Sequence, residues 1–479
     1  MTRPAPLHTS GMERMEGVDA GYLYMETPTM HMHTLKIAII EPREGFTFER
    51  FQEQMLARLG QLPPLQRRAL PVPLSLNHPL WISDQPIEPE RHLFLHDLPA
   101  PGGMAELEAV TGEIAGTPLD RSIPLWEMHV CQGMADGRIA VIGKMHHALA
   151  DGVAANALLG NITDQSDDPE QNPAPQKDSR SDSWNLEPTP TKAEQTRLAL
   201  SDAIRQMGTV HGLLSRTASG VNAVVRHRRG DSVSVPRPVL DAPRASFNGA
   251  LGASRIFATC TLPLDDIKQV RKANGVTVND VVLAIVAGAL RDWTRSRGED
   301  LSGSLLAGVP VSTDDPEGPA RLGGNRVSNL FTTLATDVDD PRERLLEISR
   351  TTAASKKVQQ HLGPHMLTEW VQFTPPAPFS AALKLYSKYN MAARHSPPFN
   401  VIVSNVKGPA QDVTIAGSKL SDLFSVGPLI EGIGLNVTAW SYAGRLNVSI
   451  LSCPDLVDDL GPLVARMRPA LDELANMPD

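Results

Sequence analysis

The chain has 479 residues, of which 41% are hydrophobic and 21% charged, which is the composition of a globular protein. A single core stops growing at roughly 250 to 300 residues, so we expect two domains of similar size. The formal net charge of -9 argues against a nucleic-acid partner that is recognised through bulk positive charge. The cysteines, Cys131, Cys260 and Cys453, have no CxxC spacing, which predicts neither a zinc site nor a disulfide framework.

The N-terminal segment contains no apolar run that could serve as the core of a signal peptide. The longest apolar stretch, residues 281–290, is about half of the roughly 20 residues that a membrane-spanning helix needs. We therefore expect an intracellular protein in a reducing compartment, without a membrane-spanning helix.

The first part of the chain predicts a mixture of strands and helices. Residues 33–41 have a strand pattern, and residues 48–62 have the apolar spacing of a helix. Residues 125–145 resemble two strands joined by a hairpin turn at Asp136-Gly137. We assign residues 1–162 to an N-terminal domain.

Two adjacent histidines end this strand pair, in the segment KMHHALADG at residues 144–152. Side chains alternate along a strand, so His146 and His147 should point in opposite directions, and only one can line a given cavity. Asp151 precedes good helix formers and is a candidate helix N-cap. Taken alone, the segment is more simply interpreted as satisfied polar groups and a cap than as a site.

Residues 163–191 are dense in Asp, Ser, Pro, Gln and Asn and predict an exposed linker, because they cannot bury enough apolar surface to fold. Beyond it, apolar side chains at steps of three and four predict an amphipathic helix over residues 196–216. The apolar stripe consists of Leu200, Ile204, Met207, Val210 and Leu214, and a basic cluster of Arg226, Arg228 and Arg229 follows.

The second half repeats the mixture of strands and helices. Residues 254–275 predict a strand and then a helix, residues 277–293 predict a buried helix, and residues 399–408 and 434–453 predict strands. Both halves therefore predict α/β or α+β domains, the second spanning residues 192–479 with the amphipathic helix at its start.

Common enzyme motifs are absent from the sequence: it has no GxSxG elbow, P-loop, HExxH or dinucleotide-binding GxGxxG. What remains is the histidine segment, which matches HHxxxDG at His146, His147, Asp151 and Gly152. This is the signature of the CoA-dependent acyltransferase superfamily, which includes chloramphenicol acetyltransferase and the condensation domains of peptide synthetases.

Three further ordered motifs sharpen this resemblance. They are a PLW element, an ND element and an SNVPGP-like element, formed by Pro124, Leu125 and Trp126, by Asn279 and Asp280, and by Ser404, Asn405, Gly408 and Pro409. With the early segment at residues 19–33, they resemble the bacterial wax ester synthase/diacylglycerol acyltransferase family over nearly the whole chain. There are two departures: Lys407 stands where the family usually has proline, and residues 309–318 lack an arginine often seen after the serine.

The resemblance implies a two-domain acyltransferase fold of mixed α/β class, with chloramphenicol-acetyltransferase-like halves and a channel between them. It implies an enzyme that transfers an acyl group directly from acyl-CoA to diacylglycerol or a long-chain alcohol. His147 would be the general base, since a neutral imidazole can accept a proton near neutral pH, and His146 would turn into the structure. Asp151 would anchor the loop by pairing with an arginine, although an orienting role as in a catalytic triad stays open. Acyl-CoA would be a co-substrate, and we expect no cofactor and no metal.

Several motif residues also have a purely structural interpretation. Pro124, Leu125 and Trp126 fit a rigid strand entrance with a core indole, and Thr277 and Asp280 have the spacing of a capping box. His31 and His33 would share one strand face as ordinary polar groups, since two histidines without a third ligand do not make a metal site.

Two other functions remain open from the sequence: acylation of a different hydroxyl, such as a glycolipid or specialised metabolite, and a catalytically silent acyl-CoA- or lipid-binding protein. Because the expected acceptors dissolve in lipid, we predict peripheral association with the inner face of the plasma membrane or with lipid droplets. Residues 192–229 are the candidate contact, and the alternative is that their apolar stripe packs between the domains while the arginines bind CoA phosphates or stay solvated.

Overall fold

The computed structural model describes residues 12–164, 186–230, 235–238, 240–315, 318, 321–362 and 366–477. The side chains of residues 221–230, 362, 367 and 368 are outside this description. Most of the predicted linker, and the side chains of the basic cluster Arg226, Arg228 and Arg229, therefore lie outside the described part of the chain.

The first of two large sheets carries the histidine segment. Its six strands lie in the order β12 (Thr414–Ile415), β13 (Ser418–Val426), β2 (His33–Glu41), β7 (Ile139–His146), β6 (Trp126–Gln132) and β5 (Leu93–Asp97). Strands β6 and β7 are antiparallel neighbours, which confirms the hairpin predicted at Asp136-Gly137. Opposite β7, His33 of β2 pairs with His146, so the sheet sets the position at which the motif begins.

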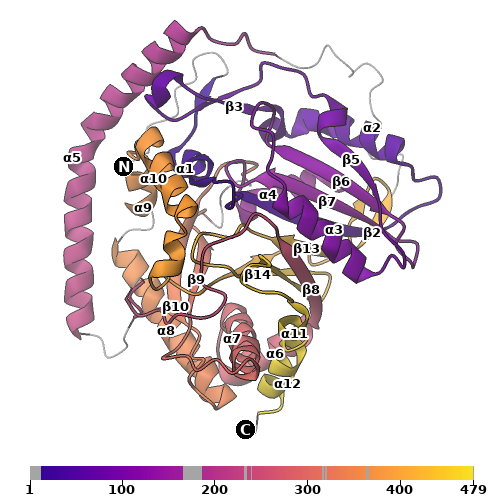
Figure 1. The fold of residues 1–479 in the computed structure, drawn as a ribbon, viewed down its shortest axis with the longest axis vertical. Coiled ribbons are helices and arrows are strands. Elements are labelled where there is room, and N and C mark those ends of the chain that lie inside the picture. The colour runs from indigo at the N-terminus through magenta and orange to yellow at the C-terminus, as the bar shows by residue number, and fades with distance from the viewer. Residues whose placement is uncertain are drawn as a thin grey trace.

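The second sheet also has six strands. Their order is β10 (Val327–Thr333), β9 (Leu306–Ser312), β11 (Val401–Lys407), β14 (Asn436–Tyr442), β15 (Arg445–Ser452) and β8 (Ile256–Pro263). Below this sheet in Figure 1 lies α7 (Val278–Ser296), which is buried along almost its whole length as predicted. Its apolar side chains pack with those of the strands into one continuous core.

The remaining elements cover the sheets and link the halves. A small three-stranded sheet contains β1 (Glu13–Arg14), β4 (Leu80–Ile82) and β3 (Arg68–Leu70). The other helices are α1 (Gly17–Met25), α2 (Phe48–Arg58), α3 (Met104–Gly116), α4 (Gly152–Ile162), α5 (Lys192–Gly230), α6 (Leu264–Asn274), α8 (Pro341–Leu362), α9 (Met366–Val371), α10 (Pro376–Lys388), α11 (Gly461–Val464) and α12 (Met467–Ala475). Short 3₁₀ turns are η1 (Leu59–Gln61), η2 (Pro63–Gln66), η3 (Pro73–Ser75), η4 (Pro89–Arg91) and η5 (Met391–Arg394).

The two sheets do not divide the chain at the predicted linker. Strands β12 and β13 come from the second half but lie in the first sheet, where Val426 pairs with Leu35 of β2. The sheets also touch: the ammonium of Lys36 on β2 lies 4.6 Å from the ring centroid of Trp440 on β14. Elements on both sides of the linker therefore build the region around the histidines.

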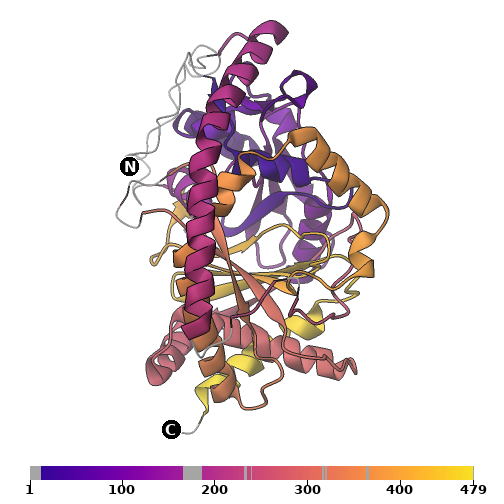
Figure 2. The same ribbon diagram turned by 90° about the vertical axis from the view of Figure 1, so that its left-hand side faces the viewer.

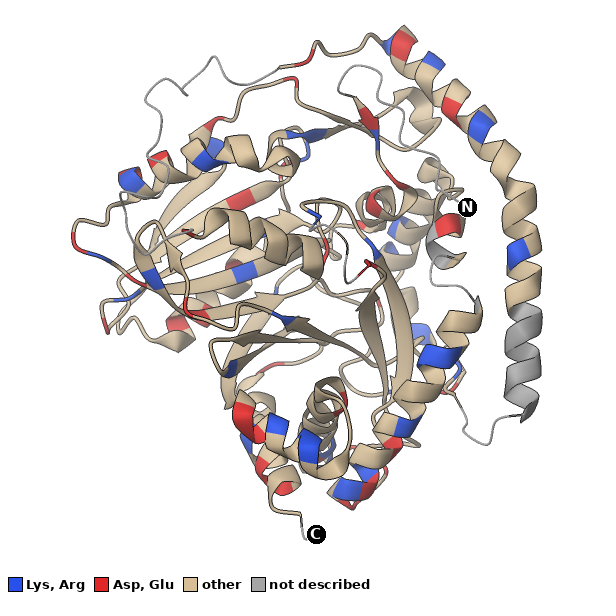
Figure 3. Ribbon diagram, turned by 180° about the vertical axis from the view of Figure 1, so that it is seen from behind, with Lys and Arg blue, Asp and Glu red and all other residues tan. Residues whose placement is uncertain are grey.

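Helix α5 runs along the outside of the molecule across both halves (Figure 2). It packs on η3, α8 and α9, and Ala199 and Leu213 are its buried apolar contacts. Charged residues gather on the first turns of α5 and on the helices beneath the second sheet, while the strands carry few (Figure 3). No single described helix is long and apolar enough to cross a membrane; only α6 and α7 taken together, at an angle of 106°, meet the length and composition.

Candidate active site

His146 points into the first half of the molecule. Its ring is fully buried, its Nδ1 accepts a hydrogen bond from the backbone N–H of Ala148 at 3.0 Å, and its Nε2 lies 3.2 Å from the Glu26 carboxylate. Its own N–H donates to the carbonyl of Leu125 at 2.9 Å, which ties the motif to the PLW element. As expected from strand alternation, His146 and His147 face different surroundings.

The ring of His147 lies between α1 and the segment before β10. It stacks on the ring of Tyr22, with the centroids 4.2 Å apart and an interplanar angle of 18°. Its Nδ1 is 3.0 Å from Oδ1 of Asn325. The Nδ2 of Asn325 donates both to Oδ1 of Asp19 at 2.8 Å and to the His147 carbonyl at 2.7 Å. The amide oxygen therefore faces Nδ1, and the network assigns the proton of the neutral imidazole to Nδ1.

This arrangement leaves the other ring nitrogen of His147 able to accept a proton. No described residue hydrogen-bonds to Nε2, and the Nδ1–H tautomer leaves its lone pair available. Burial lowers the pKa of His147 to about 4, against the opposing influence of Asp151, of the residue's own backbone carbonyl and of Asn325. The imidazole is consequently neutral at neutral pH, which is the state that a general base requires.

Asp151 holds the loop after His147 by four hydrogen bonds. Its Oδ1 caps α4 by accepting from the N–H groups of Val153 and Ala154, at 3.1 and 2.9 Å, as predicted. Its Oδ2 accepts from Arg321 Nη2 at 2.7 Å and from the backbone N–H of Arg326 at 2.8 Å. The carboxylate is only 1% exposed and makes no contact with His147 among these bonds, so its geometry is that of an anchor.

The residues that hold the histidine loop from the other side, 321–326, were missed by the sequence analysis. Besides Arg321 and Asn325, the backbone of Gly324 takes part: its N–H donates to the Leu149 carbonyl at 2.7 Å, and its carbonyl accepts from the Asp151 N–H. Gly324 has a φ of +74°, which suits glycine. The available signal was two adjacent glycines followed by a polar residue between two strands, which marks a turn but names no partner.

The SNVPGP-like element approaches the start of α4. A Cβ on Gly152 would lie 3.3 Å from Cγ2 of Val406, so the helix start and the end of β11 are in close contact. Gly408 is required by space, since a Cβ there would be 2.2 Å from Nε1 of Trp440. Lys407 is exposed at the end of β11, while Ser404 and Asn405 keep partial exposure on this strand. The carbonyl of Pro409 accepts from Ala443 N–H at 3.1 Å.

The PLW element has the structural form expected of a strand entrance. Trp126 is buried, its Nε1–H donates to the Leu65 carbonyl at 2.7 Å, and its ring stacks on His92. Leu125 has a second feature: with Leu23, Val72 and Ala381 it lines a pocket of about 400 Å³ between α1, η3 and α10. Pro124 precedes it, and its carbonyl accepts from the Trp126 N–H.

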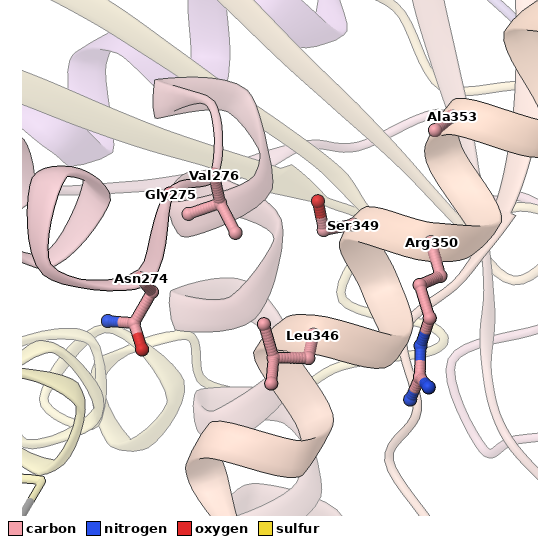
Figure 4. Close-up of a pocket in the computed structure, with 7 residues that line it drawn as sticks. All are labelled: Asn274, Gly275, Val276, Leu346, Ser349, Arg350 and Ala353. Atoms are coloured by element: carbon pink, nitrogen blue, oxygen red, sulfur yellow. The ribbon is translucent and has the colours of Figure 1, made fainter. Parts of the chain in front are cut away.

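The ND element lies elsewhere. Asp280 forms the predicted capping box with Thr277 at the start of α7, and it accepts a hydrogen bond from Ser349 of α8 at 3.2 Å. Ser349 also lines a pocket of about 360 Å³, where its side chain is on the side of Val276 (Figure 4). No hydrogen bond or ion pair in the described chain links Asn279 or Asp280 to the histidine segment.

The other histidines and the cysteines have ordinary surroundings. His31 and His33 stack with centroids 5.5 Å apart, and their Nε2 atoms pair with the carbonyls of Ala253 and Ala115. Cys131 and Cys453 are buried, and all three cysteines are free. Across the described ranges, no group of three or more His, Cys, Asp or Glu side chains is placed to hold a metal ion.

Family models match both halves of the chain. Residues 15–282 match the wax ester synthase/diacylglycerol acyltransferase catalytic domain, and residues 323–475 match the C-terminal domain of the same family. The chain belongs to this family. It is an acyltransferase of the wax ester synthase/diacylglycerol acyltransferase family, as the four sequence motifs predicted.

Curated relatives agree with this assignment over nearly their full length. A Mycobacterium tuberculosis (strain ATCC 25618 / H37Rv) protein provisionally named a diacylglycerol O-acyltransferase is 37% identical over 459 residues, covering 95% of this chain and 94% of its own. A Mycobacterium bovis protein with the same provisional name is 33% identical over 469 residues, covering 97% and 99%.

Solved structures share the fold. The wax ester synthase/diacylglycerol acyltransferase from Marinobacter aquaeolei VT8 superposes with a TM-score of 0.66 at 24% identity, covering 97% of this chain and 100% of that one. The starter condensation domain of rhizomide synthetase, solved with C8-CoA, superposes with a TM-score of 0.56 at 13% identity, covering 97% and 94%. These similarities confirm the predicted fold class, a mixed α/β two-domain acyltransferase fold.

Proposed function

We propose that this acyltransferase esterifies diacylglycerol to triacylglycerol, a long-chain alcohol to a wax ester, or both, with acyl-CoA as co-substrate and His147 as general base. The observation that carries the proposal is the bond from His147 Nδ1 to Asn325, because it leaves Nε2 with a lone pair on a neutral, half-buried ring. The curated relatives' names support diacylglycerol as one acceptor.

The proposed reaction is a direct transfer. His147 Nε2 takes the proton of the acceptor hydroxyl as its oxygen attacks the thioester carbonyl, and the carbonyl oxygen becomes negative. When the C–S bond breaks, the CoA thiolate leaves and takes the proton back from the imidazolium, so the products are an ester and free CoA. This cycle needs no covalent acyl-enzyme and no further cofactor or metal.

Several motif residues are proposed to contact or shape the substrates. The pocket beside Leu125 has mostly apolar walls that suit a fatty chain, and its lining also includes Arg121 and Lys384. Ser404 and Asn405 are partly exposed on β11 near the start of α4, which favours them as further contacts, while Gly152, Gly408 and Pro409 shape the backbone there. As the resemblance implies, the two substrates would reach His147 from opposite ends of a channel between the halves.

We also propose that α5 is the lipid-surface contact. The predicted alternative, an apolar stripe packed between the domains, is wrong for the described part of the stripe: Leu200 and Leu214 are each 52% exposed, and Ile204 and Met207 are each 67% exposed. Arg205 and Arg216 are exposed on the same helix, where they pair with Asp202 and Glu369, and would exchange these carboxylates for the phosphates of an anionic lipid surface. Such a contact would bring the enzyme to acceptors that dissolve in the membrane or in droplets.

The test is product analysis after incubating the purified protein with labelled palmitoyl-CoA and, separately, diacylglycerol, hexadecanol and a glycolipid acceptor. We expect label in triacylglycerol or wax ester. Label in the glycolipid product alone would replace the acceptor assignment. Label that stays in bound acyl-CoA without any ester would instead indicate a silent lipid-binding protein and would overturn the proposal.

A further inference from the structure

We infer that Asn325 and Asp19 are positioning residues for His147: Asn325 holds the Nδ1–H tautomer of the imidazole, and Asp19 holds the amide of Asn325 in the orientation this requires. The inference rests on the proposed role of His147 as base and deepens it. Neither residue belongs to the four motifs, although Asp19 begins the early segment at residues 19–33 that shares the resemblance.

The orientation of the Asn325 amide is determined by its neighbours. Both neighbours of its Nδ2, the Asp19 carboxyl and the His147 carbonyl, offer acceptor oxygens, at 2.8 and 2.7 Å. A flipped amide would place its own oxygen against both acceptors and lose two hydrogen bonds in a buried site, where an unsatisfied polar group pays its full desolvation cost. Only the observed orientation presents Oδ1 to Nδ1 of the imidazole.

Asp19 is placed and buried so that it can accept the hydrogen bond from the Asn325 amide. It lies in the first turn of α1, is 4% exposed, and Asn325 is the side chain hydrogen-bonded to it. Burial raises the pKa of Asp19 to about 8, although Asn325 and Arg321 lower it. A carboxyl group keeps an acceptor oxygen whether or not it is protonated, so the bond from Asn325 persists in both states.

One face of α1 thus controls the imidazole in two ways. Asp19 and Tyr22 are three positions apart and therefore share a helix face. Tyr22 stacks on the His147 ring and sets its plane, while Asp19 acts on its tautomer through Asn325. The order carboxyl, amide, imidazole places a carbonyl dipole with its negative end at Nδ1–H, which favours the imidazolium that forms during transfer.

The decisive experiment exchanges the carboxyl and the amide. Asn325→Asp keeps an acceptor beside Nδ1 but removes the amide donors to Asp19 and to the His147 carbonyl, so this acceptor is no longer held in one orientation. We expect kcat to fall about 10²-fold with the KM for palmitoyl-CoA changed less than about threefold. The double variant Asp19→Asn/Asn325→Asp places an amide donor behind the acceptor again. We expect the kcat of the double variant to be at least about tenfold higher than that of Asn325→Asp. It should stay below the wild-type kcat, because the carboxylate at position 325 cannot donate to the His147 carbonyl.

A matched control is the exposed pair Asp97 and Gln132, in which an amide donates to a carboxylate at 2.6 Å. The same exchange there, Asp97→Asn/Gln132→Glu, should leave kcat unchanged. The inference is overturned if Asn325→Asp keeps wild-type kcat in folded protein, or if the double variant is no faster than Asn325→Asp. Loss of activity in His147→Ala together with full activity in Asn325→Asp would overturn only this inference, whereas full activity in His147→Ala would overturn the proposed base itself.

A second measurement applies if Asn325→Asp does not fold. In protein labelled with ¹⁵N-histidine, the His147 signals, assigned by their loss in His147→Gln, should report the Nδ1–H tautomer in the wild type. In Asn325→Ala we expect a mixture of tautomers. An unchanged tautomer in that variant would overturn the inference.

Discussion

The histidine loop and helix α5 are opposites in how their residues are used. In the loop, polar groups are buried: Asp151 is 1% exposed and satisfied by four donors from two regions of the chain. In α5, apolar groups are exposed: Ile204 and Met207 are each 67% exposed, whereas Leu213 on the other face is buried. Both depart from the usual rule that apolar side chains are inside and polar ones outside.

The difference indicates which property of the protein each region determines. Burying and satisfying polar groups costs conformational freedom but leaves a single geometry, which suits proton transfer. Leaving an apolar stripe in water is unfavourable in the isolated protein and becomes favourable on a lipid surface. Changes in the loop should therefore affect catalysis and folding, and changes in the α5 stripe should affect where the protein binds.

The largest effect is expected for His147→Ala. Removing a general base costs about 10²- to 10⁴-fold in rate, and the half-buried ring adds little to the core, so kcat should collapse at an almost unchanged melting temperature. His211→Ala, an exposed histidine on α5, is the control and should keep full activity. Near-wild-type turnover of folded His147→Ala would remove His147 from the mechanism.

Asp151→Ala should reduce both stability and activity. The variant loses the cap of α4, worth about 0.5 to 2 kcal/mol, and leaves Arg321 with one carboxylate partner, Asp314, in place of two. We expect a total loss of about 3 kcal/mol in the free energy of unfolding, measured by urea denaturation. A wild-type unfolding curve combined with lost activity would instead favour a direct role for Asp151 in the reaction.

Acid should weaken the fold before it switches off the base. Burial lowers the pKa values of His31 and His147 to about 4 and holds that of His33 well below its usual value, whereas the unfolded value is near 6.5. Between these values the unfolded chain binds more protons, so stability is present above about pH 6.5 and is lost as the pH falls toward 4. Asp19 has the opposite effect on stability, because its raised pKa means that the folded chain binds one proton that the unfolded chain does not.

From pH 7 to pH 5 we therefore expect a falling melting temperature while kcat stays nearly constant, because His147 remains neutral. Parallel melting curves and initial rates across this range provide the measurement. A kcat that halves near pH 6.5 at constant stability would mean that the base has an unperturbed pKa.

The smallest effect on folding is expected in the α5 stripe. Ile204→Ser/Met207→Ser should change the free energy of unfolding by less than about 0.5 kcal/mol, since both side chains are exposed. The same variant should float less with liposomes of palmitoyl-oleoyl phosphatidylglycerol. Leu213→Ser, on the buried face of the same helix, is the contrast and should lower the melting temperature.

Charge-reversal variants test whether the basic cluster contributes to lipid binding in addition to the apolar stripe. If the contact extends along the helix, changing Arg226, Arg228 and Arg229 to Glu should also weaken flotation, and more strongly at low salt. Intact flotation after both sets of changes would show that α5 is not the lipid contact.

Local pattern was enough for much of this protein. Strand alternation placed His146 and His147 on different sides, the residues after Asp151 predicted a capped helix, and the apolar run at residues 281–290 predicted the buried α7. The apolar stripe of α5 was also predicted from the sequence, but its surroundings were not. A period of three to four predicts that a helix has an apolar face and does not predict whether that face contacts the core, another domain or solvent.

What the sequence by itself determined is the acyltransferase family and the local conformation, because the HHxxxDG spacing and helix or strand periodicity depend on near neighbours in the chain. What only the tertiary structure decided is which groups surround His147. Asp19, Asn325 and Arg321 are separated from it by more than a hundred residues, and β13 crosses from the second half into the first sheet. Such contacts are made by the folding of distant segments into one core, and no local pattern records which polar group will meet which.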